Sequence, residues 1–284
     1  MAWRCDDGGE VMIGLSDTSP DVERRMYDIY RNMPAWRKIQ LVTEAYRGAR
    51  RLHEAGCRLR QPGATTADVN RAWANVTLGV GPWSEQLRIK SVTPQNEQDA
   101  AIKAVIAALD ALYIRYAIGG SYASSAHGVP RYTHDADITV EPFPWKERLF
   151  ALRFPAEEFY VSEEAIREAL ARRARFNIIH LHSGFKIDIF IRKDRSFDRE
   201  VLARRMKARV FVGDESEYGL ITPEDSILMK LEWFRMGGET SEKQWTDIHG
   251  VLMTQGDRLD IAYLDRWAAE IGVKDLLDRA RAAC

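Results

Sequence analysis

The stretch AIGGSYASSAHGVPRYTHDADITV, residues 117–140, decides the fold of this chain. Its pattern indicates an apolar strand, a Gly-Gly-Ser turn at residues 119–121, a short helix of small residues and a second strand that opens with Asp135 and Asp137. Residues i and i+2 of a strand point to the same face, so the two carboxylates are expected to hold a metal together. Oxygen ligands of this kind suit Mg²⁺ or Mn²⁺, whose coordination is completed by water and substrate phosphates.

The turn has the properties of a phosphate site. Gly119 and Gly120 permit a close approach to the backbone. The amides at the start of the following helix, together with the Ser121 hydroxyl, form a corner that binds anions.

A third carboxylate is needed if two metal ions are to act on one phosphoryl transfer, because each ion requires a ligand that the other does not use. Asp188 is the candidate, within the strand pattern FKIDIFI at residues 185–191. A lone DxD is as often a turn cap or an ion-pair partner. The order of turn, DxD and strand aspartate favours the metal site.

These motifs resemble the nucleotidyltransferase superfamily related to DNA polymerase β, particularly its minimal bacterial members and the abortive-infection toxins of the AbiEii type. The resemblance covers roughly residues 100–255. It implies that Gly120 and Ser121 hold nucleotide phosphates. It also implies that three residues bind metal and carry the catalysis: Asp135, Asp137 and Asp188.

Two later segments also resemble family motifs. TPEDSILMKLEWFR, residues 222–235, would carry a nucleotide-contacting Lys230, and KQWTDIHGV, residues 243–251, would place polar and acidic positions at Lys243 and Asp247.

Two residues just ahead of the aspartates, Arg131 and Thr133, match positions that comparable members of the family carry. An arginine there can clamp a triphosphate with two hydrogen bonds. A loop arginine paired with a surface carboxylate is the alternative.

The resemblance implies transfer of an NMP from an NTP, such as ATP, to an acceptor hydroxyl. The acceptor would be RNA, for example a tRNA 3′ end, or a protein, and a toxin of this kind would have an antitoxin partner. Two alternatives stay open: an enzyme acting on small molecules such as aminoglycosides, and a non-catalytic nucleotide-binding or interaction protein. The three carboxylates argue against a non-catalytic protein, because buried like charges are costly without a neutralising metal.

Histidines offer a competing metal site. His134 adjoins the aspartates, and His180 and His182 alternate onto one face of the strand before Asp188. No cysteine or further histidine stands at zinc spacing, so packed or solvated histidines, or contact with the acceptor, are the preferred interpretation.

Charge is unevenly distributed in a chain whose formal net charge is −1. Residues 165–209 carry 13 Lys or Arg against 5 Asp or Glu, residues 24–60 carry 10 against 3, and the part from 213 onward carries 8 against 15. The two basic segments predict a groove for a triphosphate or an RNA backbone, or else solvated helix faces.

Composition predicts a cytoplasmic protein without a membrane span. No run of about 18 apolar residues exists, and the first residues, MAWRCDDGGE, lack the pattern of a signal peptide. The three cysteines, Cys5, Cys57 and Cys284, belong to no motif and are expected to be free thiols.

The expected fold class is α+β: a mixed sheet with flanking helices. Three units are predicted: a helical N-terminal accessory unit and linker at 1–90, a nucleotidyltransferase core at 91–221, and a helical C-terminal region at 222–284. In the first unit we expect helices from Pro20 to about Met33 and from about 35 to 60, then a third capped by Thr65 and Asp68. Later strands are expected near 175–182, 186–192 and 207–212, and helices near 97–112, 146–152, 162–172, 222–236, 241–255, 260–271 and 273–283.

Overall fold

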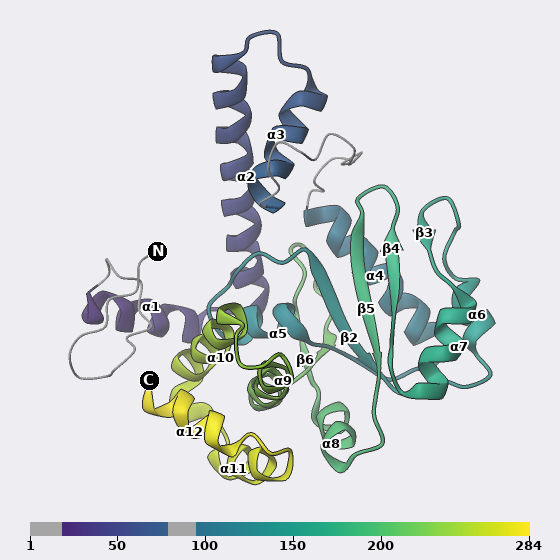
Figure 1. The fold of residues 1–284 in the computed structure, drawn as a ribbon, viewed down its shortest axis with the longest axis vertical. Helices are drawn as coiled ribbons and strands as arrows, with labels where there is room; N and C mark the ends of the chain where they lie inside the picture. Colours follow the sequence, from purple (N-terminus) through teal and green to yellow (C-terminus); the bar gives the residue numbers. More distant parts are fainter. Residues whose placement is uncertain (1–18, 79–94) are drawn as a thin grey trace.

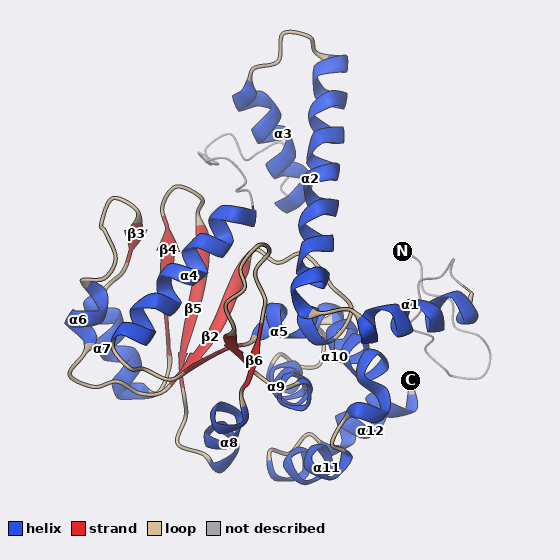
Figure 2. Ribbon diagram, turned by 180° about the vertical axis from the view of Figure 1, so that it is seen from behind, coloured by secondary structure: helices blue, strands red, loops and turns tan. Residues whose placement is uncertain are grey.

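The computed structural model describes residues 19–78 and 95–284 (Figure 1). Cys5 and the linker expected at 79–94 lie outside the described residues. Within them a seven-stranded sheet has helices on both sides (Figures 1 and 2), which confirms the predicted α+β class. The three-unit division of the chain stays a prediction.

The sheet has the strand order β3-β4-β5-β2-β1-β7-β6. Two neighbouring pairs are parallel, β2 with β5 and β1 with β7, and the other four pairs are antiparallel. The strands are β1 (Tyr116–Ile118), β2 (Asp135–Val140), β3 (Phe159–Tyr160), β4 (Arg175–His180), β5 (Phe185–Ile191), β6 (Met206–Ala208) and β7 (Tyr218–Leu220).

The helices follow the expected segments closely. Ahead of the sheet are α1 (Pro20–Asn32), α2 (Ala35–Arg60), α3 (Thr66–Leu78) and α4 (Gln95–Ala111); within it are α5 (Gly120–His127), α6 (Glu147–Ala151), α7 (Glu163–Arg172) and α8 (Ser196–Arg204); after it come α9 (Pro223–Met236), α10 (Glu242–Gln255), the 3₁₀ turn η1 (Gly256–Arg258), α11 (Ile261–Glu270) and α12 (Lys274–Ala282).

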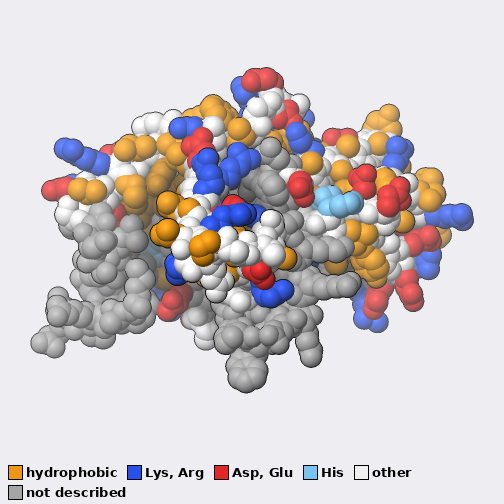
Figure 3. Space-filling model, turned by 90° about the horizontal axis from the view of Figure 1, so that it is seen from above, with side chains coloured by type: hydrophobic (Ala, Val, Ile, Leu, Met, Phe, Trp, Pro, Cys, Tyr) orange, Lys and Arg blue, Asp and Glu red, His pale blue; other side chains and the backbone are white. Residues whose placement is uncertain are grey.

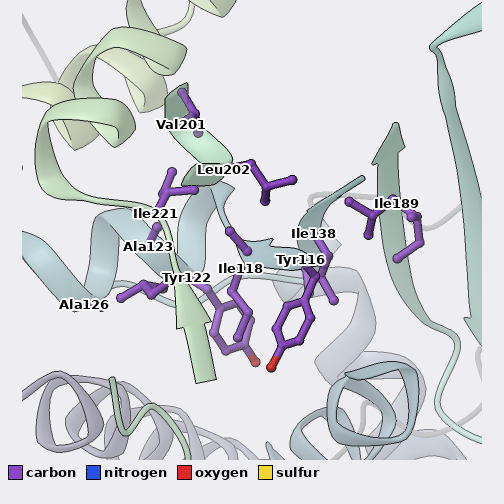
Figure 4. Close-up of a cluster of buried hydrophobic side chains, with 14 of the residues drawn as sticks. Tyr116, Ile118, Tyr122, Ala123, Ala126, Ile138, Ile189, Val201, Leu202 and Ile221 are labelled. Atoms are coloured by element: carbon purple, nitrogen blue, oxygen red, sulfur yellow. The ribbon is translucent and has the colours of Figure 1, made fainter. Parts of the chain in front are cut away.

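One face of the central strands makes the core. The alternate residues of β2 and β5 on this face are almost completely buried: Ala136, Ile138, Val140, Ile187, Ile189 and Ile191. Figure 4 shows Ile138 and Ile189 within the surrounding cluster of apolar side chains. Helix α4 lies across this side of the sheet (Figure 2), and its Ile102, Val105 and Leu109 are fully buried.

The opposite side of the sheet carries α5, α9 and α10 (Figure 1). His127 at the end of α5 makes a 2.7 Å hydrogen bond with the backbone oxygen of Ile221, just before α9. A Cβ on Gly128 would come within 2.8 Å of the backbone of Gly250 and Val251 in α10. A glycine is therefore required for α5 to approach α10 so closely.

Helices α2 and α3 form an arm, residues 35–78, that projects from the rest of the molecule (Figures 1 and 2). The capping arrangement predicted at Thr65 is present, since the Asp68 amide donates to Thr65 Oγ1 at 3.2 Å and the Thr65 amide donates to Asp68 Oδ2 at 3.0 Å. Trp73 of α3 packs edge-on against Tyr46 of α2 and donates its indole N–H to the Tyr46 hydroxyl at 2.9 Å.

The structure differs from expectation in its shortest elements. Strands β3 and β7 were not expected, and the strand predicted at 207–212 runs from Met206 to Ala208. Strands of two or three residues are too short to show an alternating pattern. Helix α8 was also missed, because its buried Phe197, Val201 and Leu202 span barely more than one turn. No helix in the described ranges is long and apolar enough to cross a membrane.

Gly128→Ala is expected to destabilise the fold by about 1–3 kcal/mol, because the added methyl group forces α5 away from the α10 backbone. Gly48→Ala is the matched control. Gly48 lies in the interior of α2 with nothing within 4 Å of an added Cβ, so this change should stabilise by about 0.5–1 kcal/mol. Urea unfolding of both variants measures the difference, and a Gly128→Ala protein as stable as wild type would contradict the packing.

Candidate functional site

Four charged side chains form a square on one face of the sheet. In the parallel pair of β2 and β5, Asp135 lies beside Lys186 and Asp137 lies beside Asp188. Neighbouring strands are about 4.8 Å apart, and residues i and i+2 share a face. The structure therefore brings the three predicted aspartates together and adds one lysine.

Asp188 is the most buried member of the square, with 3% of its surface exposed. Its Oδ2 accepts a 2.7 Å hydrogen bond from the Lys186 ammonium. Its Oδ1 is buried and has no hydrogen-bond partner among the described residues. Lys186 was not among the predicted site residues, although its position two residues before Asp188 on the same strand is a sequence signal for this pair.

Asp137 lies directly against the glycine turn. Gly120 has a φ of +53°, and a Cβ at this position would lie 1.7 Å from Asp137 Oδ2. The Gly119 amide also donates to the Asp137 backbone oxygen at 2.8 Å. Burial, followed by the charges of Asp135 and Asp188, raises the pKa of Asp137 to about 6.

The loop before β2 orients one aspartate of the square and also carries an arginine. Thr133 Oγ1 donates to Asp135 Oδ1 at 2.8 Å. Arg131 makes two hydrogen bonds to Asp247 of α10, at 2.5 and 2.6 Å, and its Nη2 donates to Ser121 Oγ at 2.7 Å. The predicted Arg131, Thr133, Ser121 and Asp247 thus belong to one network.

Asp247 holds two cations at once, because Lys230 of α9 also donates to its Oδ2, at 2.7 Å. The Asp247 side chain is only 4% exposed. Burial acts to raise the pKa of Asp247, but Arg131 and Lys230 hold it below its ordinary value. Burial also lowers the pKa of Lys230. Two cations share one carboxylate beside Ser121, so the cluster carries an excess positive charge suited to an anion.

The same loop is attached to the arm through Tyr132. Its ring stacks on Tyr46 of α2 with centroids 4.3 Å apart and planes 4° from parallel. Its hydroxyl accepts a 2.9 Å hydrogen bond from Gln98 of α4. Three successive residues, Arg131, Tyr132 and Thr133, therefore contact Asp247, the arm and the first aspartate. The sequence contained no signal for this junction beyond the presence of two tyrosines.

In the described part of the chain, the histidines do not gather with other ligands into a group of three that could hold a metal. His134 is exposed and contacts the edge of Tyr132, with ring centroids 4.8 Å apart. His180 and His182 have ring centroids 5.8 Å apart, and His180 Nδ1 lies 2.7 Å from Ser183 Oγ. Lys243 is exposed in the first turn of α10.

The carboxylates of the square are ligands of the kind that suits a divalent cation, and the strand register places them side by side. The unpartnered Oδ1 of Asp188 and the raised pKa of Asp137 are both signs of negative charge that lacks a counter-ion. Across residues 19–78 and 95–284, however, no three His, Cys, Asp or Glu side chains are already arranged as metal ligands. We therefore expect the ligand set to close only with a nucleotide, whose phosphate oxygens complete the coordination.

Comparison with known proteins gives distant structural neighbours. No protein-family model and no curated protein sequence matches the chain. Among solved structures, the solution structure of the antibiotic-resistance factor ANT(2'')-Ia has a TM-score of 0.36 and 17% identity, covering 66% of this chain and 94% of that chain.

Two further structures have similar scores. The crystal structure of ANT(2'')-Ia in complex with adenylyl-2''-tobramycin has a TM-score of 0.37 and 16% identity, covering 62% of this chain and 97% of that chain. An antigenic nucleotidyltransferase-like protein from Paracoccidioides brasiliensis has a TM-score of 0.33 and 15% identity, covering 64% and 91%. Scores this low establish no shared family, so function has to be argued from the site itself.

Asp137→Asn is expected to stabilise the metal-free protein. A carboxyl whose pKa is about 6 in the folded state and about 3.9 in the unfolded state costs stability above pH 6, by about 1–3 kcal/mol, and costs nothing below about pH 4. Denaturation of both proteins in the presence of EDTA measures the effect. The free energy of unfolding of the variant should exceed that of wild type at pH 7.5, and the difference should shrink at pH 4.5. A variant less stable than wild type at pH 7.5 would show that Asp137 has a structural role.

Asp247→Asn should destabilise the protein by about 2–4 kcal/mol, because Arg131 and Lys230 lose their shared counter-charge. Inorganic triphosphate should then raise the melting temperature more in the variant than in wild type, since the anion replaces the missing charge. The control is Asp257→Asn, which affects only an exposed ion pair with Arg31. Equal responses of both variants to triphosphate would argue against an anion site at this cluster.

Proposed function

We propose that this protein is a nucleotidyltransferase that moves an NMP from an NTP to an acceptor hydroxyl. The observation that carries the proposal is the position of Asp135, Asp137 and Asp188 on one sheet face, directly against the Gly120 turn. A structural role does not account for this arrangement, since gathering three carboxylates around a single lysine costs stability.

The cationic cluster beside the turn is assigned to the triphosphate. Arg131 and Lys230 share one carboxylate, and Arg131 also contacts Ser121 in the first turn of α5. Amides in the first turn of a helix lack acceptors within the helix and point toward an anion. The phosphates would thus be bound by the backbone of residues 119–121 and by these two side chains.

Asp188 is assigned to the acceptor. Its buried Oδ1 has no hydrogen-bond partner in the described part of the chain, so its lone pairs are not committed to another group of the protein. The acceptor oxygen attacks the α-phosphorus, the bond from that phosphorus to the bridging oxygen breaks, and pyrophosphate leaves with the electron pair. The hydroxyl proton passes to Asp188, and Lys186 limits the charge at this carboxylate between turnovers.

Mg²⁺ or Mn²⁺ would be held by the three aspartates, and it would supply positive charge to the phosphates and lower the pKa of the acceptor hydroxyl. Thr133 fixes the rotation of Asp135, and the close contact of Asp137 with Gly120 holds that carboxylate against the turn that would bind the phosphates. These contacts place the substrate before the reaction and cost no reorganisation during it.

Two narrower hypotheses belong to this proposal. The acceptor is RNA, such as a tRNA 3′ end, which is supported by the basic segments at 24–60 and 165–209. A toxin activity controlled by an antitoxin rests on the sequence resemblance alone, and growth arrest on expression, relieved by an adjacent small gene, would test it.

The reaction is tested by incubating the protein with Mg²⁺, each α-labelled NTP and total RNA, and by resolving label on RNA, protein and small molecules. Asp188→Asn should lower transfer at least 1000-fold while NTP binding measured without metal stays within about threefold, because the phosphate contacts assigned to residues 119–121, Arg131 and Lys230 do not involve Asp188. EDTA should abolish transfer by wild type, and Mn²⁺ or Mg²⁺ should restore it.

Asp110→Asn is the matched control and should leave transfer unchanged. Asp110 is an exposed carboxylate of α4, which lies on the opposite side of the sheet from the square. Full activity of Asp188→Asn would disprove the assigned role. Absence of label and of pyrophosphate with every NTP, in the presence of RNA, protein and aminoglycosides, would contradict the proposed function as a whole.

A further inference from the structure

The outer half of the arm is rich in arginine. From Glu44 to Arg71 the chain carries six arginines, no lysine and three carboxylates. Each carboxylate is within ion-pair distance of an arginine: Glu44 with Arg37, Glu54 with Arg58, and Asp68 with Arg71. Six arginines against three carboxylates give the outer arm an excess of positive charge.

Three of the arginines share one side of α2. Arg47, Arg51 and Arg58 are exposed and are separated by four and seven residues, which places them within about 40° of one another around the helix. At about 1.5 Å per residue they extend over about 16 Å. Figure 3 looks down on the end of the arm and shows Lys and Arg side chains gathered near its centre.

The inner end of this arginine face is one residue along α2 from a contact with the loop of the candidate site. Arg47 follows Tyr46, which stacks on Tyr132 in the loop between Arg131 and Thr133. Both ribbon views show the arm rising beside β2, on the side of the sheet where β2 and β5 begin (Figures 1 and 2). A long anionic molecule bound along α2 would therefore reach the aspartates at the base of the arm.

We propose that the arginine face of α2, formed by Arg47, Arg51 and Arg58, binds the phosphodiester backbone of a single-stranded RNA acceptor and delivers its 3′ hydroxyl to Asp188. Arginine presents a planar fork that matches phosphate oxygens in two hydrogen bonds, whereas a lysine is a point charge. The two acidic residues beside this face, Glu44 and Glu54, are already paired with Arg37 and Arg58. The assignment of the arm to the acceptor rests on the proposed function.

Binding is measured apart from catalysis. A labelled 20-nucleotide RNA with a free 3′ end is titrated with the full chain at 50 to 200 mM salt, without NTP. Changing Arg47, Arg51 and Arg58 together to Gln should weaken binding about tenfold or more at 100 mM salt. The slope of log K against log salt should fall by about 2, because each lost phosphate contact accounts for about 0.7 in a single strand.

The control changes Arg148, Arg153 and Arg235 to Gln, three arginines that lie outside both basic segments. This set is matched, since all three are exposed and Arg235 forms an i,i+4 ion pair with Glu239 as Arg58 does with Glu54. RNA affinity of the control should stay within twofold of wild type.

Equal RNA affinity of the arm variant and wild type, or no binding by wild type at micromolar concentration, would overturn the proposal. The failure of the two hypotheses is distinguishable. A protein that binds RNA through the arm but releases no pyrophosphate contradicts the proposed reaction alone. A protein that labels another acceptor and ignores RNA contradicts the arm assignment alone.

Discussion

The register of β2 against β5 is the constraint on which the whole site depends. It pairs Asp137 with Asp188 and Asp135 with Lys186, and it does so because the alternate residues Ile138, Ile187 and Ile189 must face the core. A slip of one residue would move the carboxylates to the other face and expose the isoleucines. The hydrophobic core therefore fixes the position of the polar groups.

The charges around this register are balanced in two different ways. Lys230 and Arg131 are both neutralised only in part by Asp247, which leaves positive charge next to the turn. The square on the sheet has the opposite imbalance, with three carboxylates and one ammonium. Under the proposed function, the cationic cluster would bind the phosphates and the square would bind the metal ion. Such tension between stability and charge is typical of functional sites.

Much of this could be predicted from the sequence. The turn, the DxD and the strand aspartate are local patterns, and the caps at Thr65 and Thr222 mark helix starts by chemistry that operates within four residues. The position of Lys230 and Asp247 in two helices was also predictable. Their mutual ion pair was not, because it depends on how α9 packs against α10.

The remaining features depend on contacts between distant parts of the chain. The stack of Tyr46 on Tyr132 joins residues 86 positions apart, and nothing in either local sequence specifies it. The pairing of Lys186 with Asp188 is local by contrast, and its sequence signal, a spacing of two residues on β5, was not used. The short strand β3 pairs with the longer β4, and β7 pairs with β1 on one side and β6 on the other. Both depend on partners elsewhere in the chain, so their own sequences carry little information.

The most direct test is a crystal structure of the protein with Mg²⁺ and a non-hydrolysable NTP analogue. The proposed function predicts that this crystal structure will have metal on Asp135 and Asp137 and phosphates against residues 119–121. It also predicts Arg131 or Lys230 within hydrogen-bond distance of a phosphate oxygen. A nucleotide bound elsewhere, with the three aspartates free of metal and Asp188 still paired only with Lys186, would contradict this account.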